Sequence, residues 1–337
     1  PWRRQSRAAA AAPYGRLCVK KRPWFKADGL LLLTAIIWGL AFAAQRMGMD
    51  YIGPFAYNGL RFAIGALCMA PFALRASRAR ARTAAIGAPT TDAGTPPMKS
   101  AEKALWSAAA GLVLFAGSSL QQIGLVETTA GNAGFITCLY VVIVPLLGVL
   151  GGKKAGLRIW MGAALALTGL YLLSIRNGFR MAPGDILVLI GAFFWAFHII
   201  IVGRLARVMD PSELGFGQYT VCAALSLISA VAFEPAPFAG TMAAAIPILY
   251  GGFLSIGVAF TLQIVAQKTA HPAHASIILS MEALFAALGG AVILGETIDG
   301  RTALGGALML AGMVISQTIK PEPAPASRYP QSTRSGS

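Results

Sequence analysis

The sequence predicts an all-α integral membrane protein in which ten transmembrane helices form two inverted five-helix repeats. Three observations predict this fold class: long apolar stretches, basic residues that occur in every second intervening segment, and patterns that occur twice along the chain. Of the 337 residues, 56% are hydrophobic and only 12% are charged, whereas about 25% are charged in a typical soluble domain. A soluble globule cannot bury so large an apolar fraction, so we expect a polytopic membrane protein.

Ten apolar stretches, each close to the roughly 20 residues that a membrane-spanning helix needs, are separated by charged, Gly, Pro or other turn residues. We expect the spans near residues 29–47, 54–74, 104–124, 131–151, 158–175, 185–203, 213–233, 243–266, 272–295 and 301–319. Several are rich in Gly and Ala, which allow helices to approach closely in lipid.

The charge distribution predicts the orientation of the chain. The chain has 28 Lys and Arg residues against 13 Asp and Glu residues, for a formal net charge of +15. Most of the Lys and Arg residues lie in alternate segments between the spans. The positive-inside rule places those segments, and with them both termini, in the cytoplasm. Membrane topology therefore explains the positive charge, and no nucleic-acid partner is expected.

The chain divides into two repeats and two tails. We expect a basic cytoplasmic tail at 1–27, a first repeat at 28–176 with a cytoplasmic loop at 75–103, a second repeat at 185–319 and a cytoplasmic tail at 320–337. The basic, acid-free N-terminal segment also has the composition of a transit peptide, which is the alternative for that tail.

Three series of matched residues indicate an internal duplication. An offset of 157 positions aligns DGLLLLTAIIW with DILVLIGAFFW, an offset of 141 aligns Gln-Ile pairs, and an offset of 143 aligns glycines of the fifth helices. The matches are Asp28 with Asp185, Trp38 with Trp195, Arg61 with Gln218, Gln122 with Gln263, Gly162 with Gly305 and Gly169 with Gly312. They follow chain order, as diverged repeats do. An odd number of spans per copy inverts the second copy in the membrane, an arrangement typical of transporters.

Polar and aromatic side chains inside the spans define a candidate substrate cavity. They lie toward the outer side in the first half and toward the inner side in the second, as expected when inverted copies surround one cavity. The candidates are Trp38, Asn58, Arg61, Gln121, Gln122, Tyr140, Trp195, His198, Gln218, Gln263, Ser280 and Glu282. Helix packing is the alternative role for each, because polar side chains also bond helices together in lipid.

Two charged candidates stand out because ionised groups in the bilayer are costly, at about 2.5–3.5 kcal/mol on insertion scales. Glu282, near the middle of the ninth span, is a candidate for proton coupling or for binding a cationic substrate; the alternative is a structural acid bonded to neighbouring polar groups. Arg61 is a candidate partner for a substrate carboxylate, with Asn58 one turn earlier as a further donor, unless its side chain snorkels to the interface.

The uncharged candidates have similar alternatives. The imidazole of His198 suits a proton relay, although a lone histidine in a span is more often a packing residue. The rings of Trp38, Trp195 and Tyr140 provide flat walls for an organic solute, or else pack in the core.

Motifs for cofactors, metals and catalysis are missing from the sequence. The string GVLGGKKA lacks the G-x-x-x-x-G-K-[ST] pattern of a phosphate loop. His271 and His274 have no third ligand nearby, and the four cysteines have no paired spacing. We therefore expect no cofactor, no metal site and no enzymatic activity, and secondary rather than ATP-driven transport.

Several short motifs together resemble a known family. They are Trp38-Gly39, the TCLYVVIVPLLG run at 137–148, the ALFAALGGAVILGE run at 283–296 and the two Gly-spaced fifth helices. With them the chain resembles EamA-type members of the drug/metabolite transporter superfamily over about residues 28–319. The resemblance implies a ten-helix secondary transporter with peripheral fifth and tenth helices, a central cavity and export of small metabolites, amino acids or drug-like compounds.

Two positions depart from that family pattern. Gly151-Gly152-Lys153 stands where many members carry the Gly-Glu pair that the second copy keeps at Gly295-Glu296, and Ala283 replaces a frequent proline. We expect a permease of the cell inner (plasma) membrane that exports a small amphipathic molecule by alternating access, with protons as the candidate coupling ion. The alternatives are a membrane-embedded lipid-processing enzyme, which the short outer loops disfavour, and a non-transporting membrane scaffold.

Overall fold

The computed structural model describes residues 24–85, 98–150, 152, 156–174, 181–205, 208–267 and 278–317, and its regular elements there are all helices. In chain order they are α1 (Trp24–Gly48), α2 (Pro54–Ala85), α3 (Ser100–Gly124), α4 (Ala130–Cys138), α5 (Tyr140–Leu150), α6 (Leu157–Ser174), α7 (Pro183–Leu205), α8 (Pro211–Phe233), α9 (Ala245–Leu249), the π-helix η1 (Tyr250–Ala259), α10 (Phe260–Gln267), α12 (Glu282–Leu294) and α13 (Gly300–Gln317).

These helices form a membrane-crossing bundle. Seven helical stretches in the described part of the chain are long and apolar enough to span a bilayer, and α6, α12 and α13 are shorter apolar helices. Large apolar side chains project from the bundle surface, including Leu67, Val231 and Val292, which are 72%, 68% and 82% exposed. Lipid accommodates such a surface, whereas water does not. The predicted all-α membrane fold is confirmed.

The second span is longer than predicted. α2 continues to Ala85, and so includes residues that the sequence assigned to the 75–103 loop. That stretch consists largely of Ala and Arg, two residues with high helix propensity. Arg80 forms an ion pair with Glu213 in the first turn of α8, and Lys103 Nζ lies 3.4 Å from the same carboxylate. The extra turns are therefore anchored to α8 by a carboxylate that also binds Lys103 of α3.

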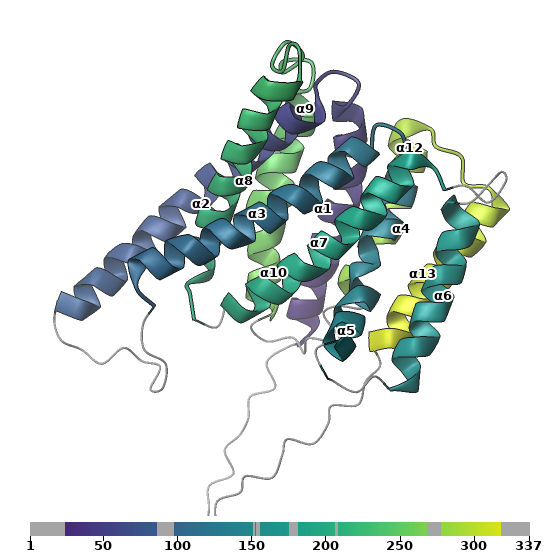
Figure 1. Ribbon diagram of the computed structural model, residues 1–337, viewed down its shortest axis with the longest axis horizontal. Helices are drawn as coiled ribbons and strands as arrows, with labels where there is room; N and C mark the ends of the chain where they lie inside the picture. The colour runs from purple at the N-terminus through teal and green to yellow at the C-terminus, as the bar shows by residue number, and fades with distance from the viewer. Residues whose placement is uncertain are drawn as a thin grey trace, which may run out of the picture.

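The fifth helices of the two repeats pair at one edge of the bundle, where α6 and α13 lie side by side (Figure 1). A Cβ on Gly169 would lie 2.5 Å from the carbonyl oxygen of Gly305, and a Cβ on Gly312 would lie 2.5 Å from that of Gly162. Since the offset of 143 relates Gly162 to Gly305 and Gly169 to Gly312, each contact is the symmetry mate of the other. Such reciprocal contacts are the mark of a two-fold axis.

A second point on the axis lies between α2 and α8. The rings of Phe62 and Tyr219 pack there with their centroids 6.0 Å apart. The offset of 157 makes these two residues equivalent, so each contacts its own counterpart. Residues that do so lie close to the symmetry axis, which places this axis in the middle of the bundle.

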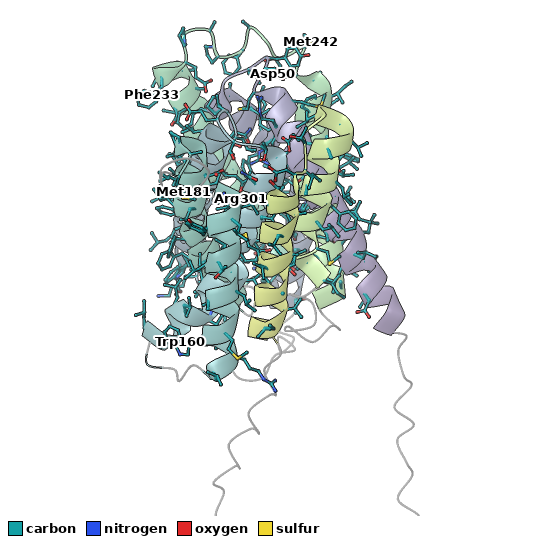
Figure 2. All side chains as sticks on the ribbon, turned by 90° about the vertical axis from the view of Figure 1, so that its right-hand side faces the viewer. Asp50, Trp160, Met181, Phe233, Met242 and Arg301 are labelled. Carbon is teal, nitrogen blue, oxygen red and sulfur yellow. The ribbon has the colours of Figure 1, made fainter. Side chains whose placement is uncertain are left out.

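The two copies run in opposite directions. Asp50, Phe233 and Met242 lie at one end of the bundle and Trp160 near the other (Figure 2). Asp50, which follows α1, and Asp185, in the first turn of α7, border the same cavity. The first helix of one copy therefore ends where the first helix of the other begins, and the predicted inverted repeat is confirmed.

The main apolar core lies where α4, α5, α7 and α12 meet. It includes Ile136, Ala192 and Ala283, which have no exposed surface. A second cluster around Phe62 and Cys222 joins α2, α3, α8 and η1. The polar side chains described below lie within and between these two clusters.

Candidate transport site

The fourth and ninth spans each contain a tightened turn instead of a continuous α-helix. In the fourth, the Leu139 N–H donates to the carbonyl of Ile136 at 3.1 Å, and α5 begins at the next residue. In the ninth, the Met281 N–H donates to the carbonyl of Ile278 at 3.1 Å, and α12 begins at Glu282. Both bonds are of the 3₁₀ type, and discontinuous helices of this kind form the central sites of inverted-repeat transporters.

Glu282 joins the two turns. Its side chain is 5% exposed, and its Oε1 accepts hydrogen bonds from Tyr140 Oη at 3.1 Å and from Cys138 Sγ at 3.2 Å. Tyr140 and Glu282 are separated by 142 positions, between the offsets of 141 and 143 that relate the flanking helices. They are therefore equivalent residues in contact across the two-fold axis.

The Trp38-Gly39 motif explains how α1 reaches this point. A Cβ on Gly39 would lie 2.6 Å from the carbonyl oxygen of Glu282, so only glycine permits the close approach of α1 and α12. Trp38 Nε1 donates to the carbonyl of Ser255 in η1 at 2.9 Å. Its equivalent, Trp195, donates to Gln121 Oε1 in α3 at 2.8 Å. Each tryptophan thus connects the first helix of its own repeat to the third span of the other.

Arg61 lies deep in the bundle and is 4% exposed. Its Nε donates to Asn58 Oδ1 at 2.9 Å, and Asn58 Nδ2 donates to the carbonyl of Ser118 at 3.0 Å. The guanidinium carbon lies 4.8 Å from the centroid of the Phe62 ring and 5.7 Å from that of Tyr57. Asn58, expected as a further donor to a substrate carboxylate, instead accepts from Arg61 and donates to Ser118. The Arg61 side chain does not reach the bundle surface.

No carboxylate of the described residues forms an ion pair with Arg61. An arginine at the centre of a membrane helix costs about 2.5–3.5 kcal/mol on insertion scales, and stacking on aromatic rings offsets about 0.5–2 kcal/mol. The positive charge therefore remains only partly compensated.

The two glutamines of α3 form a hydrogen-bond network with Gln45 of α1, which was not among the candidates predicted from the sequence. Gln121 Nε2 donates to Gln45 Oε1 at 3.2 Å, and Gln122 Nε2 donates to the Gln45 carbonyl at 3.2 Å. Thr137 Oγ1 adds a donor to Gln121 Oε1 at 3.4 Å. Gln45 is a polar residue within the first predicted span. That polarity alone would have been enough to name it as a cavity candidate from the sequence.

The remaining candidates form a separate group or stand apart. His198 Nε2 lies 2.8 Å from Gln218 Oε1, and both side chains are buried. Ser280 is buried in the ninth-span turn, at the position equivalent to Cys138. Gln263 is half-buried on α10. The structure therefore distributes the candidates over several polar groups, centred on Arg61, Gln121, Gln218 and Glu282, rather than over one wall.

A cavity of about 970 Å³ opens at the end of the bundle that contains Asp50, and none of the twelve predicted residues lines it. Its charged lining residues are Arg46, Asp50, Glu127, Asp185 and Glu296. Arg46 Nη1 lies 2.9 Å from Asp50 Oδ1, and Thr128 donates a hydrogen bond to Asp185. Arg46 and Asp185 lie at the very ends of predicted spans, and Asp50, Glu127 and Glu296 lie outside them, so a search for polar residues within the spans did not select these five.

Two carboxylates of the second repeat cap helices of the first at this same end. Glu296 accepts from the N–H groups of Ala130 at 2.7 Å and Gly131 at 3.2 Å, at the start of α4. Glu234 accepts from those of Phe55 at 2.7 Å and Ala56 at 3.2 Å, at the start of α2. A carboxylate that satisfies free N–H groups at a helix start is stabilising. The Gly-Glu pair of the sequence motif is one of these caps.

Within the ranges that the structure describes, no group of three or more His, Cys, Asp or Glu side chains could hold a metal ion. His271 and His274 lie outside those ranges.

Comparison with known proteins matches both repeats. The sequence model of the EamA-like transporter family matches residues 25–175 and 182–318. An "Uncharacterized transporter" of Archaeoglobus fulgidus is 32% identical over 290 residues, which cover 86% of this chain and 85% of the relative. The "Uncharacterized inner membrane transporter YedA" of Escherichia coli (strain K12) is 26% identical over 286 residues, with coverage of 80% and 84%.

A solved structure, described only as "Crystal structure of protein", is similar in fold. The TM-score is 0.56 at 22% identity, and the match covers 86% of this chain and 96% of the other. The duplicated family match and the inverted helices agree with each other and with the resemblance inferred from the sequence. The chain belongs to the EamA-like transporter family and is a multi-pass membrane transporter, not an enzyme.

Proposed function

We propose that this transporter exports small amphipathic metabolites, such as amino acids or drug-like compounds, across the cell inner membrane by alternating access between its two repeats. Both termini, with the tails at 1–27 and 320–337, face the cytoplasm in this proposal, because the basic residues gather in the segments on that side. The Escherichia coli relative, named as an inner membrane transporter, supports the same location.

The observation that carries the proposal is the contact of Glu282 with Tyr140 between the two tightened turns. A group on an in-plane two-fold axis lies midway between the two membrane surfaces. When the repeats exchange their shapes, such a group becomes accessible from each side in turn. The two equivalent turns supply the positions at which both repeats can bend.

The substrate path follows from the polar groups around that point. We assign Trp38, Asn58, Arg61, Gln121, Gln122, Tyr140, Trp195, His198, Gln218, Gln263, Ser280 and Glu282 to its walls. Their amides and rings suit a solute with both polar and apolar parts. The cavity beside Asp50 and Glu296 is the exit vestibule of this path.

Proton coupling is assigned to Glu282. The titratable groups that contact its carboxylate are Cys138 and Tyr140, both hydrogen-bond donors, and no basic side chain of the described residues forms an ion pair with it. A carboxylate held this way can gain and lose a proton as the surrounding repeats change shape. Proton entry on one side and release on the other would drive substrate in the opposite direction.

Metabolite-resolved efflux tests the proposal. Proteoliposomes that contain the purified full chain are loaded with a cell metabolite extract, and the external medium is analysed by mass spectrometry against protein-free liposomes. We expect a small set of amphipathic compounds to leave only the protein-containing vesicles. Identical losses from both preparations, over gradients of either direction, would contradict the transport proposal.

A further inference from the structure

We infer that Arg61 is the binding site for a carboxylate group of the transported molecule, so that the substrate class is small organic acids, amino acids included. The inference rests on the proposed transport function and specifies which chemical group the path recognises. It follows from the unmet hydrogen-bonding capacity of Arg61, from the orientation of its head group and from the surroundings of that group.

The unmet capacity concerns the two terminal nitrogens of the guanidinium. Of its five N–H donors, only the one on Nε has an acceptor among the described residues, namely Asn58 Oδ1 at 2.9 Å. The side chain is nonetheless 96% removed from solvent. The two terminal nitrogens are not among the fully buried atoms of the described residues that have no partner, so they keep some accessible surface. A carboxylate is the acceptor that matches two parallel N–H groups of a guanidinium.

Asn58 fixes the direction in which those free donors point. Its amide is itself held, because Nδ2 donates to the carbonyl of Ser118 on α3 at 3.0 Å. The guanidinium is therefore bound at its Nε edge and presents its Nη1 and Nη2 edge away from Asn58. A donor pair that is oriented before binding loses little conformational entropy when the ligand arrives.

The surroundings of Arg61 suit the apolar part of such a molecule. The rings of Tyr57 and Phe62 lie against the guanidinium. Gly251 of the π-helix η1 lies beside both Tyr57 and Arg61, where a Cβ would be 3.0 Å from Tyr57 Oη and 3.3 Å from Arg61 Cδ. π-Helical segments are frequent at functional sites, and here one brings backbone without a side chain next to the charge.

The equivalent position of the second repeat shows the same unmet capacity without the charge. Gln218 is fully buried, and its Nε2 has no hydrogen-bond partner in the described part of the chain, while its Oε1 is bound by His198. Donors without acceptors thus occur at both members of a repeat-related pair. Only the first repeat carries a cation at this position, namely Arg61. The carboxylate end of the substrate is therefore bound by the first repeat.

A purely structural role for Arg61 predicts different behaviour. If stacking and the Asn58 bond were its purpose, replacing it with glutamine would lower the melting temperature Tm of the unliganded protein. If it is a ligand site, Arg61→Gln removes an incompletely paired charge, and the unliganded Tm stays the same or rises. The two roles are therefore separable by stability alone.

Ligand-dependent thermal stability of the full chain in detergent tests the inference directly. The probes are acetate, propionate, benzoate and leucine, each compared with a neutral amide analogue, namely acetamide, propionamide, benzamide and N-acetyl-leucinamide. We expect at least one carboxylate, and none of the amides, to raise the Tm of the wild type. The Arg61→Gln variant should bind that carboxylate about tenfold to 100-fold more weakly, from the loss of a charged hydrogen-bond pair.

Three further variants keep the result interpretable. Arg61→Lys keeps the charge but loses the planar donor pair, and should bind with intermediate affinity. Asn58→Ala keeps Arg61 but releases its orientation, and should also weaken carboxylate binding. Arg301→Gln, at an exposed arginine, should respond like the wild type. Equal stabilisation of wild type and Arg61→Gln, equal effects of acids and amides, or no effect of any carboxylate would overturn the inference.

Efflux separates this inference from the proposed function. Compounds exported by wild-type proteoliposomes should carry a carboxylate, and Arg61→Gln should lose them. If wild type exports compounds and Arg61→Gln exports the same ones at the same rate, the carboxylate site is wrong while transport stands. Carboxylate binding in the absence of any efflux would contradict the transport function and leave the site itself supported.

Discussion

The two repeats of this transporter share a scaffold but differ in chemistry at equivalent positions. The first repeat carries Arg61 where the second carries Gln218, and Tyr140 where the second carries Glu282. The helix contacts around the axis are reciprocal, whereas the charges are not. Symmetric packing allows two alternative shapes of similar free energy, and the unequal charges can then give each repeat its own task. In the proposed mechanism, the first repeat binds the substrate and the second the proton.

The contact between the fifth helices tests the symmetric half of this comparison most strongly. Adding a methyl group at Gly169 or at Gly312 places it 2.5 Å from a carbonyl oxygen of the opposite helix. We expect each Gly→Ala change to lower the free energy of unfolding by about 1–3 kcal/mol, because the helices must separate. Thermal unfolding of the purified variants measures this.

Gly203→Ala on α7 is the matched control, because no atom lies within 4 Å of the added Cβ. It should be neutral or stabilising by up to about 1 kcal/mol, the helix propensity difference. Destabilisation at Gly169 with none at Gly312 would break the reciprocity of the α6–α13 contact.

The helix caps sharpen the comparison, because both capping carboxylates belong to the second repeat. Glu296→Gln and Glu234→Gln each remove a charge and one acceptor from two backbone N–H groups. We expect each to cost about 0.5–2 kcal/mol of stability, measured by thermal unfolding. Glu127→Gln, an exposed acid at the same end, should change stability little. Equal losses of stability in all three variants would mean that negative charge at this end of the bundle, and not helix capping, stabilises the protein.

The equivalent tryptophans should show the smallest effects. Trp38→Phe removes a donor to a backbone carbonyl, and Trp195→Phe removes a donor to Gln121 Oε1, which keeps a second donor in Thr137. We expect a loss of about 0.5–1 kcal/mol in each, with the smaller loss at Trp195. Unfolding of the two variants side by side would detect the difference, and a larger loss at Trp195 would contradict it.

The sequence predicted the features that depend on local patterns. The Asp-to-Trp spacing of the first helices and the glycine spacing of the fifth helices are short periodic signals, and they identified the repeats before any contact was known. Inversion followed from an odd number of spans. These features need no knowledge of which distant segments meet.

Features that depend on tertiary contact escaped the sequence. Nothing in the TCLYVVIVPLLG run other than Pro145 interrupts an apolar helix, yet the tightened turn lies at Leu139, beside Glu282 of another span. Glu234 caps Phe55 across a separation of 179 residues, from a loop with no motif. The ion pair that anchors the extended α2 likewise depends on Glu213, which is far from Arg80 in the chain. The contact of Tyr140 with Glu282 joins residues 142 positions apart and therefore has no local signal in the sequence.

Proton movement during substrate transport, measured in proteoliposomes of wild type, Glu282→Gln and Tyr140→Phe, tests the division of tasks between the repeats most directly. The wild type should move protons against the substrate and respond to an imposed pH gradient. Glu282→Gln should still exchange labelled for unlabelled substrate, but without proton movement and without response to the gradient, whereas Tyr140→Phe should stay coupled. Proton movement in Glu282→Gln equal to that of the wild type would contradict the assignment of coupling to the second repeat.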